Sequence, residues 1–175
     1  MKKALIVVDY QNDFVGGSLG FPGAEALERP ICDKIREYKK HGWDVIFTYD
    51  THGEDYLQTR EGKGLPIIHC VKDTDGWQLY GKVEALRGPD TPCFCKPSFG
   101  SMELAEYLLC RRYEELELVG LVSNICVISN AVLAKAALPE CRVLVDAACT
   151  LGPDKALHEK ALDVLEGLQI EVLHR

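Results

Sequence analysis

Three residues whose side chains can cooperate in nucleophilic catalysis each follow an apolar segment of the sequence. Asp9 ends the apolar run 4–8, Lys96 follows the run 91–95, and Cys126 comes shortly after Gly120. A cysteine attacks as its thiolate, a carboxylate can accept the thiol proton, and an ammonium stabilises both anions. Together the three residue types predict an activated cysteine nucleophile with a carboxylate as its base. Each residue considered alone is better explained by packing, a turn cap or solvation.

The position of Cys126 favours this chemistry further. Cys126 lies just inside a segment whose apolar spacing predicts a helix. The unpaired N–H groups and the positive dipole end at a helix start stabilise a thiolate, and a nearby Lys96 would act in the same direction. We therefore expect the thiolate form of Cys126 to be favoured.

A second group of residues has the composition of a metal site. Asp50 and His52 are two positions apart, so that an extended segment points both to the same side, and Glu61 and His69 follow. Two imidazoles with one or two carboxylates are a usual ligand set for one divalent ion such as zinc, manganese or iron. Spacing alone is explained equally well by a polar loop with solvent-exposed histidines. Glu54 and Asp55 compete as oxygen ligands.

The elements that must position these residues alternate between short apolar runs and segments of helical spacing. The pattern predicts helices over 30–41, 101–112, 124–138 and 154–166, and strands over 3–8, 43–48, 91–95, 117–120, 142–145 and 169–173. Continuous apolar strands that alternate with helices indicate a three-layer α/β/α fold around a six-stranded, mostly parallel sheet. One domain over residues 1–175 is sufficient for this α/β architecture.

The predicted sheet brings the chemically active residues to one edge. In an open parallel sheet, ligands bind outside the carboxyl ends of the strands. Asp9, Asp50, Lys96 and Cys126 each follow a different strand, so we expect all four at that edge. Residues 49–90 lack a clean period and form a connection much longer than the usual 4–6 residues or so, which indicates a functional loop. His41, His158 and His174 stand among charged residues and are predicted to be solvated.

Composition excludes several classes of protein. The 175 residues contain 20 Lys+Arg and 27 Asp+Glu, a net charge of −7, and no Lys/Arg run. We therefore expect no nucleic-acid partner and no membrane partner. No apolar stretch approaches a membrane span or an export signal, which predicts a cytoplasmic protein. Most of the eight cysteines are then expected to be reduced. Nothing in the pattern specifies an oligomeric state, and a homo-oligomer remains open.

Three sequence blocks resemble those of the isochorismatase-like cysteine hydrolases. The blocks are ALIVVDYQNDF at 4–14, KPSFG at 96–100 and GLVSNICV at 120–127, in that order over nearly the whole chain. The resemblance implies that Asp9, Lys96 and Cys126 form a catalytic triad, in agreement with the argument from the strand ends. The fold of that family is also the fold predicted here.

The metal pattern resembles one branch of this family, the nicotinamidases. Members carry an Asp-x-His pair followed by a Glu or His and a later His, which Asp50, His52, Glu61 and His69 match. The resemblance implies hydrolysis of nicotinamide to nicotinate and ammonia through a thioester. It also implies a substrate-binding role for Phe14, Leu121 and Val122, with a cis peptide bond between the last two. The chain departs from many relatives at Leu65, where a Trp is common, and at Asn124, where an Asp is common.

Two other functions remain consistent with the sequence. The same triad can act on another small amide, a ureido compound or a vinyl ether such as isochorismate. A non-catalytic metal- or ligand-binding domain with a redox-sensing thiol belongs to a different class and requires no complete triad. Release of ammonia from nicotinamide separates nicotinamide hydrolysis from hydrolysis of another substrate. The binding domain predicts metal binding and Cys126 oxidation but no hydrolysis of any amide tested.

Overall fold

The computed structural model describes residues 2–175, and within them six strands form one sheet in the order β3-β2-β1-β4-β5-β6. Every neighbouring pair in this sheet is parallel, which confirms the predicted topology. The central strand β1 is apolar and buried from Ala4 to Val8, as expected for a strand with both faces covered. The strands are β1 (Lys3–Val8), β2 (Asp44–Asp50), β3 (Cys93–Lys96), β4 (Glu115–Leu121), β5 (Arg142–Leu151) and β6 (Glu171–Leu173).

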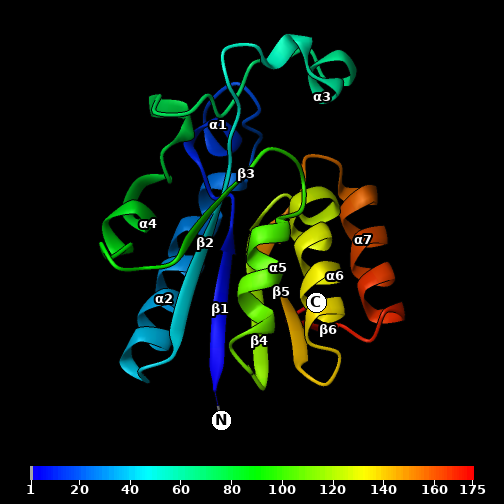
Figure 1. Ribbon diagram of the computed structural model, residues 1–175. Helices are drawn as coiled ribbons and strands as arrows, with labels where there is room; N and C mark the ends of the chain where they lie inside the picture. Colours follow the sequence, from blue (N-terminus) through cyan, green and yellow to red (C-terminus); the bar gives the residue numbers. More distant parts are fainter. Residues whose placement is uncertain (1) are drawn as a thin grey trace.

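Helices cover both faces of the sheet (Figure 1). Side chains alternate between faces along β1, so Leu5 and Val7 lie in one core cluster and Ile6 in the other. The first cluster packs against α1 (Asn12–Val15), η1 (Ala24–Leu27), α2 (Glu28–Lys40) and α4 (Gly81–Leu86). The second packs against α5 (Met102–Leu109), α6 (Ile128–Ala137) and α7 (Lys155–Gly167). The three predicted layers are therefore present.

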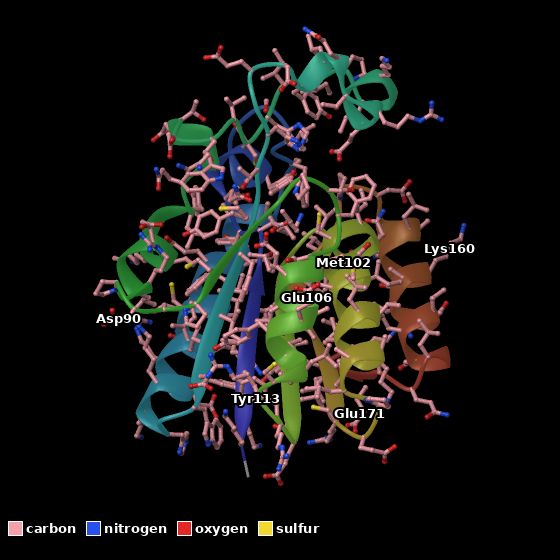
Figure 2. The ribbon with its side chains drawn as sticks, viewed as in Figure 1. Asp90, Met102, Glu106, Tyr113, Lys160 and Glu171 are labelled. Atoms are coloured by element: carbon pink, nitrogen blue, oxygen red, sulfur yellow. The ribbon has the colours of Figure 1, made fainter. Side chains whose placement is uncertain are left out.

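The outer faces of these helices carry both charged and apolar side chains. Figure 2 shows Met102 and Glu106 extending from α5 and Lys160 from α7, and all three are exposed. Among residues 2–175, no helix combines the length and apolar character that crossing a bilayer would require.

The segment between β2 and β3 is more ordered than the sequence predicts. Besides α4 it contains η2 (Tyr56–Gln58), α3 (Arg60–Gly64) and η3 (Asp75–Trp77). Elements of three to six residues are too short to show an apolar period, which is why the sequence pattern predicts only a loop here. The arm that carries α3 rises beyond the carboxyl ends of the strands (Figure 1).

Two further elements differ from the prediction. β5 continues to Leu151 rather than ending at Val145, and its register with β4 shifts between Leu118 and Gly120. The helix expected over 124–138 begins as a π-helical turn, η4 (Ser123–Val127), and continues as α6. In this turn Val127 N–H donates to the Val122 carbonyl five residues earlier, at 3.1 Å. Apolar spacing does not distinguish such a wider turn from a regular α-helical turn.

Candidate active site

The strand ends bring Asp9, Asp50, Lys96 and Cys126 together, as the parallel topology predicts. Asp9 directly follows β1, and its backbone has a φ of 44°, in the left-handed region. Asp50 and Lys96 are the last residues of β2 and β3 and are paired in register. Cys126 lies in η4, beyond the end of β4. All four side chains are buried.

Lys96 is the centre of this cluster. Its Nζ lies 2.6 Å from Asp9 Oδ2, 3.3 Å from Asp50 Oδ1 and 3.5 Å from Cys126 Sγ. It also donates to the Ser98 carbonyl at 2.9 Å. Burial alone would lower the pKa of Lys96, but Asp9, Cys126 and Asp50 raise it above its ordinary value. The ammonium therefore stays charged among two carboxylates and a thiol.

Asp9 is fully buried, and its neighbours compensate only in part for the loss of water around its carboxylate. Burial raises the pKa of Asp9 above its ordinary value, and Lys96 and Thr48 offset this only in part. Thr48 Oγ1 donates to Asp9 Oδ1 at 2.6 Å. A carboxylate with a raised pKa binds a proton more readily, which suits a general base.

Cys126 differs from the expectation that its thiolate would be favoured. Burial raises the pKa of the Cys126 thiol well above its ordinary value; Asp9 adds to this, and Lys96 opposes it only in part. Desolvation of a fully buried sulfur exceeds the effect of the nearby cation. The resting group is therefore a thiol, and attack requires transfer of its proton to a neighbouring base.

The close approach of β4 to β1 lets η4, the nucleophile turn that carries Cys126, reach this cluster. Gly120 has a φ of 113°, and a Cβ built there would lie 2.0 Å from the Val8 carbonyl oxygen. Only glycine fits this position. The Leu121–Val122 peptide bond that follows is cis, as the family resemblance implies.

Asp50, His52, Glu61 and His69 form a second cluster beside Lys96. Asp50 Oδ2 lies 3.1 Å from His52 Nε2 and 3.2 Å from His69 Nε2. Glu61 Oε1 lies 3.7 Å from His52 Nε2 and 3.9 Å from His69 Nε2. One ligand atom from each of the four residues lies within 4.8 Å of the others. Ligands about 2.0–2.2 Å from a tetrahedral ion are about 3.3–3.6 Å apart, so this spacing fits one divalent metal ion.

Two further observations agree with a metal site. His69 Nδ1 lies 2.8 Å from the Ile67 carbonyl, which fixes the tautomer so that Nε2 presents its lone pair to the cluster. Glu61 Oε2 is buried and has no hydrogen-bond partner within residues 2–175. Glu54 and Asp55, the competing oxygen ligands, are exposed and lie outside the cluster.

Comparison with known proteins identifies the family. The model of the isochorismatase domain matches residues 3–174. The chain belongs to the isochorismatase family. It is 34% identical over 144 aligned positions to the isochorismatase family protein PncA of Bacillus subtilis, covering 75% of this chain and 78% of that protein.

Two relatives of this isochorismatase-family chain are named for an activity. The nicotinamidase/pyrazinamidase of Mycobacterium tuberculosis is 29% identical over 187 aligned positions, covering 98% of both chains. The solved pyrazinamidase of Pyrococcus horikoshii in complex with zinc superposes with a TM-score of 0.86 at 25% identity, covering 100% of both chains.

Two side chains that no sequence pattern indicated, Gln11 and Asp13, hold the backbone at or beside candidate metal ligands. Gln11 Nε2 donates to the Asp50 carbonyl at 2.9 Å, and Gln11 Oε1 accepts from the Asp50 N–H at 2.8 Å. Asp13 Oδ2 accepts from the N–H of Cys70, the residue after His69, at 2.7 Å. Both are in the first family block, but their partners are distant in sequence.

A cavity of about 220 Å³ lies between the two clusters. Phe14, Val122 and Cys126 line it, as do Asp50, Glu61 and His69. The Leu121 side chain is fully buried in the core and lies outside this lining, which corrects its predicted place in the pocket. Leu121 is the last residue of β4, whereas Val122 lies beyond the strand and borders the cavity. The remaining lining is apolar and consists of Leu19, Phe21, Leu65, Phe99, Ile125 and Pro153.

Two of the histidines predicted to be solvated make contacts with buried residues. His158 is buried, and its Nδ1 lies 2.9 Å from Ser123 Oγ. His174 lies 3.0 Å from the buried carboxylate of Asp146, although 63% of its side chain is exposed, in agreement with the prediction. Charged neighbours in sequence do not reveal which face of an element a histidine occupies.

Proposed function

We propose that this isochorismatase-family chain is a cysteine amidohydrolase that converts nicotinamide to nicotinate and ammonia. The observation that carries the proposal is a cavity lined by Cys126, which contacts Lys96, and by three residues of the candidate metal site, Asp50, Glu61 and His69. Relatives named nicotinamidase in Mycobacterium tuberculosis and Saccharomyces cerevisiae support this substrate.

Asp9 acts as the general base of the first half-reaction. It accepts the Cys126 thiol proton while the sulfur attacks the carboxamide carbon, so that a C–S bond forms and the carbonyl electron pair moves to oxygen. The backbone N–H of Cys126 is assigned to stabilise this oxyanion. Lys96 balances the negative charge that passes between Asp9 and Cys126.

Asp9 also serves the later proton transfers. It returns its proton to the nitrogen as the C–N bond breaks, and ammonia leaves while a thioester remains on Cys126. It then accepts a proton from water as the water oxygen attacks the thioester carbon. The C–S bond breaks, Asp9 returns this proton to the Cys126 sulfur, and the acid product leaves and ionises to nicotinate. The raised pKa of Asp9 suits this alternation between base and acid.

Asp50, His52, Glu61 and His69 are the residues that would hold a divalent ion. When bound, such an ion supplies a Lewis-acid contact for the pyridine nitrogen, which orients the ring. We assign zinc ahead of manganese or iron, because the Pyrococcus horikoshii relative was solved in complex with zinc. Phe14 lies 5.7 Å from the His69 ring and provides an apolar wall for a flat substrate.

The test is an ammonia assay on nicotinamide with zinc, manganese and iron supplied in turn, accompanied by a panel of other amides, ureido compounds and isochorismate. We expect ammonia and nicotinate from the wild type and none from Cys126→Ala, which should keep the thermal unfolding transition of the wild type. Turnover by the alanine variant would refute the mechanism. Turnover of another panel member without nicotinamide hydrolysis would refute the substrate but keep the triad.

A further inference from the structure

A buried serine–histidine contact joins the nucleophile turn to α7. Ser123 is the first residue of η4, and its side chain is fully buried. Its Oγ lies 2.9 Å from Nδ1 of His158, a residue of the second turn of α7. Burial lowers the pKa of His158 below its ordinary value, so the imidazole is neutral and has one donor and one acceptor nitrogen.

Neither residue of this pair is placed to touch a substrate. Val122, Ile125 and Cys126 of the same stretch line the cavity, whereas Ser123 and His158 lie outside the lining. The Ser123–His158 contact therefore lies behind the turn that carries the sulfur. Any effect on the reaction must act through the position of that turn.

The turn is supported from two directions. On one side Asn130 of α6 donates to the Cys126 carbonyl at 2.8 Å. On the other side His158 contacts Ser123, and the start of α7 is itself held by Asp154, which accepts from two backbone N–H groups at 2.8 and 3.0 Å. The partners of the sulfur, Asp9 and Lys96, are instead positioned by β1 and β3.

We propose that His158 is a positioning residue that holds η4 through Ser123 and so sets the place of the Cys126 sulfur relative to Asp9 and Lys96. The proposal rests on the proposed amidase function and adds a residue to it. Val122 and Ile125 of this stretch line the cavity, but Phe14 and the four proposed metal ligands, which would orient the ring, belong to other elements. Loss of the contact should therefore affect the chemical step more than substrate binding.

The primary test compares His158→Ala with the wild type in steady-state hydrolysis of nicotinamide. A displacement of reacting groups by about 1 Å costs about 100-fold in rate, so we expect kcat to fall about 10- to 100-fold while KM stays within about twofold. A second readout needs no substrate: alkylation of Cys126 by iodoacetamide, followed by mass spectrometry of its peptide. We expect this rate to fall as well.

Two substitutions separate positioning from general stability. His158→Asn places an amide oxygen or nitrogen near the position of Nδ1, and we expect it to restore most of kcat. His174→Ala controls for the loss of an imidazole, because His174 also contacts a buried side chain through Nδ1 but is exposed and follows β6. It should leave kcat and Cys126 alkylation unchanged.

Ser123→Ala tests the partner and remains informative if His158→Ala does not fold. Ser123→Ala should reproduce the kcat loss of His158→Ala. The double variant with both substitutions should lose no more kcat than either single variant. Folded variants with unchanged kcat and unchanged alkylation would overturn the proposal. So would a loss of kcat that follows the melting temperature and is not restored by His158→Asn. If the wild type does not hydrolyse nicotinamide, the substrate assignment fails, and the alkylation comparison alone decides the role of His158.

Discussion

Two lysines of this protein, Lys34 and Lys96, each lie between two carboxylates on the same sheet, yet their surroundings differ in kind. Lys96 is at the carboxyl ends of the strands, 2.6 Å from Asp9 and 3.3 Å from Asp50. A buried thiol, that of Cys126, adjoins this lysine and lines the cavity. Its side chain is completely buried.

The cluster around Lys34 is closer to solvent than the cluster around Lys96. Lys34 projects from α2 and pairs with Glu117 of β4 and with Asp146 of β5, the latter at 2.7 Å. Tyr38 Oη donates to Glu117 at 2.7 Å, and His174 lies 3.0 Å from Asp146. The lysine side chain keeps 19% of its surface exposed.

The pKa values of Asp9 and Asp146 shift in opposite directions. Burial raises the pKa of Asp9 because Lys96 and Thr48 do not offset the loss of water. Burial would also raise the pKa of Asp146, but hydrogen bonds from Lys34 and His174 lower it below its ordinary value. The same pair of residue types therefore gives a proton acceptor in one place and a permanent ion pair in the other.

The largest predicted effect separates the two aspartates by activity. Asp9→Asn removes the proton acceptor, and because general base catalysis contributes about 10²–10⁴-fold, we expect kcat to fall about 10³-fold. Asp146→Asn should keep kcat within about twofold. Steady-state ammonia release measures both, and comparable losses in the two variants would contradict the functional distinction.

The second prediction is a loss of stability, with no loss of activity, when Lys34 is replaced. Lys34→Met leaves Glu117 and Asp146 without their shared cation, and removal of one partner of a buried ion pair costs about 3 kcal/mol. We expect this loss in urea unfolding, with kcat per folded molecule unchanged. A kcat loss like that of Asp9→Asn would show that the Lys34 cluster also serves the reaction.

Removal of a bound metal ion should affect the cluster around Lys96, which includes the proposed ligand Asp50, and not the cluster around Lys34. An ion at one hundred times its Kd stabilises the folded state by about 2.7 kcal/mol, so chelation should lower the melting temperature and raise KM for nicotinamide. In His52→Ala, which lacks one proposed ligand, chelation should have little further effect. An equal response of His52→Ala and wild type to chelation would contradict the assigned ligands.

The smallest effect is the pH dependence of stability from Asp146. A carboxyl whose folded pKa is below its unfolded value of about 3.9 contributes stability above that pH, and the contribution is lost as pH falls through the folded pKa. Urea unfolding between about pH 5 and pH 2 should therefore show a shallower loss in Asp146→Asn than in the wild type. Parallel curves would show that the Asp146 pKa is not lowered by folding.

Much of the active-site region follows from sequence alone because parallel strands share a direction. Once Asp9, Asp50 and Lys96 are each placed after a strand, the topology brings them to one edge without any knowledge of side-chain contacts. The Asp-x-His spacing likewise places Asp50 and His52 on one side of an extended segment, and the structure brings them within 3.1 Å of each other.

The sequence by itself therefore determined the order of the six strands and the four longer helices, the shared edge and the residue types gathered there. Only the tertiary structure decided the protonation of Cys126, the inward face of Val122 rather than Leu121, and the burial of His158 against Ser123. Local pattern encodes direction and periodicity, whereas desolvation and contacts between residues 35 positions apart depend on how the layers pack.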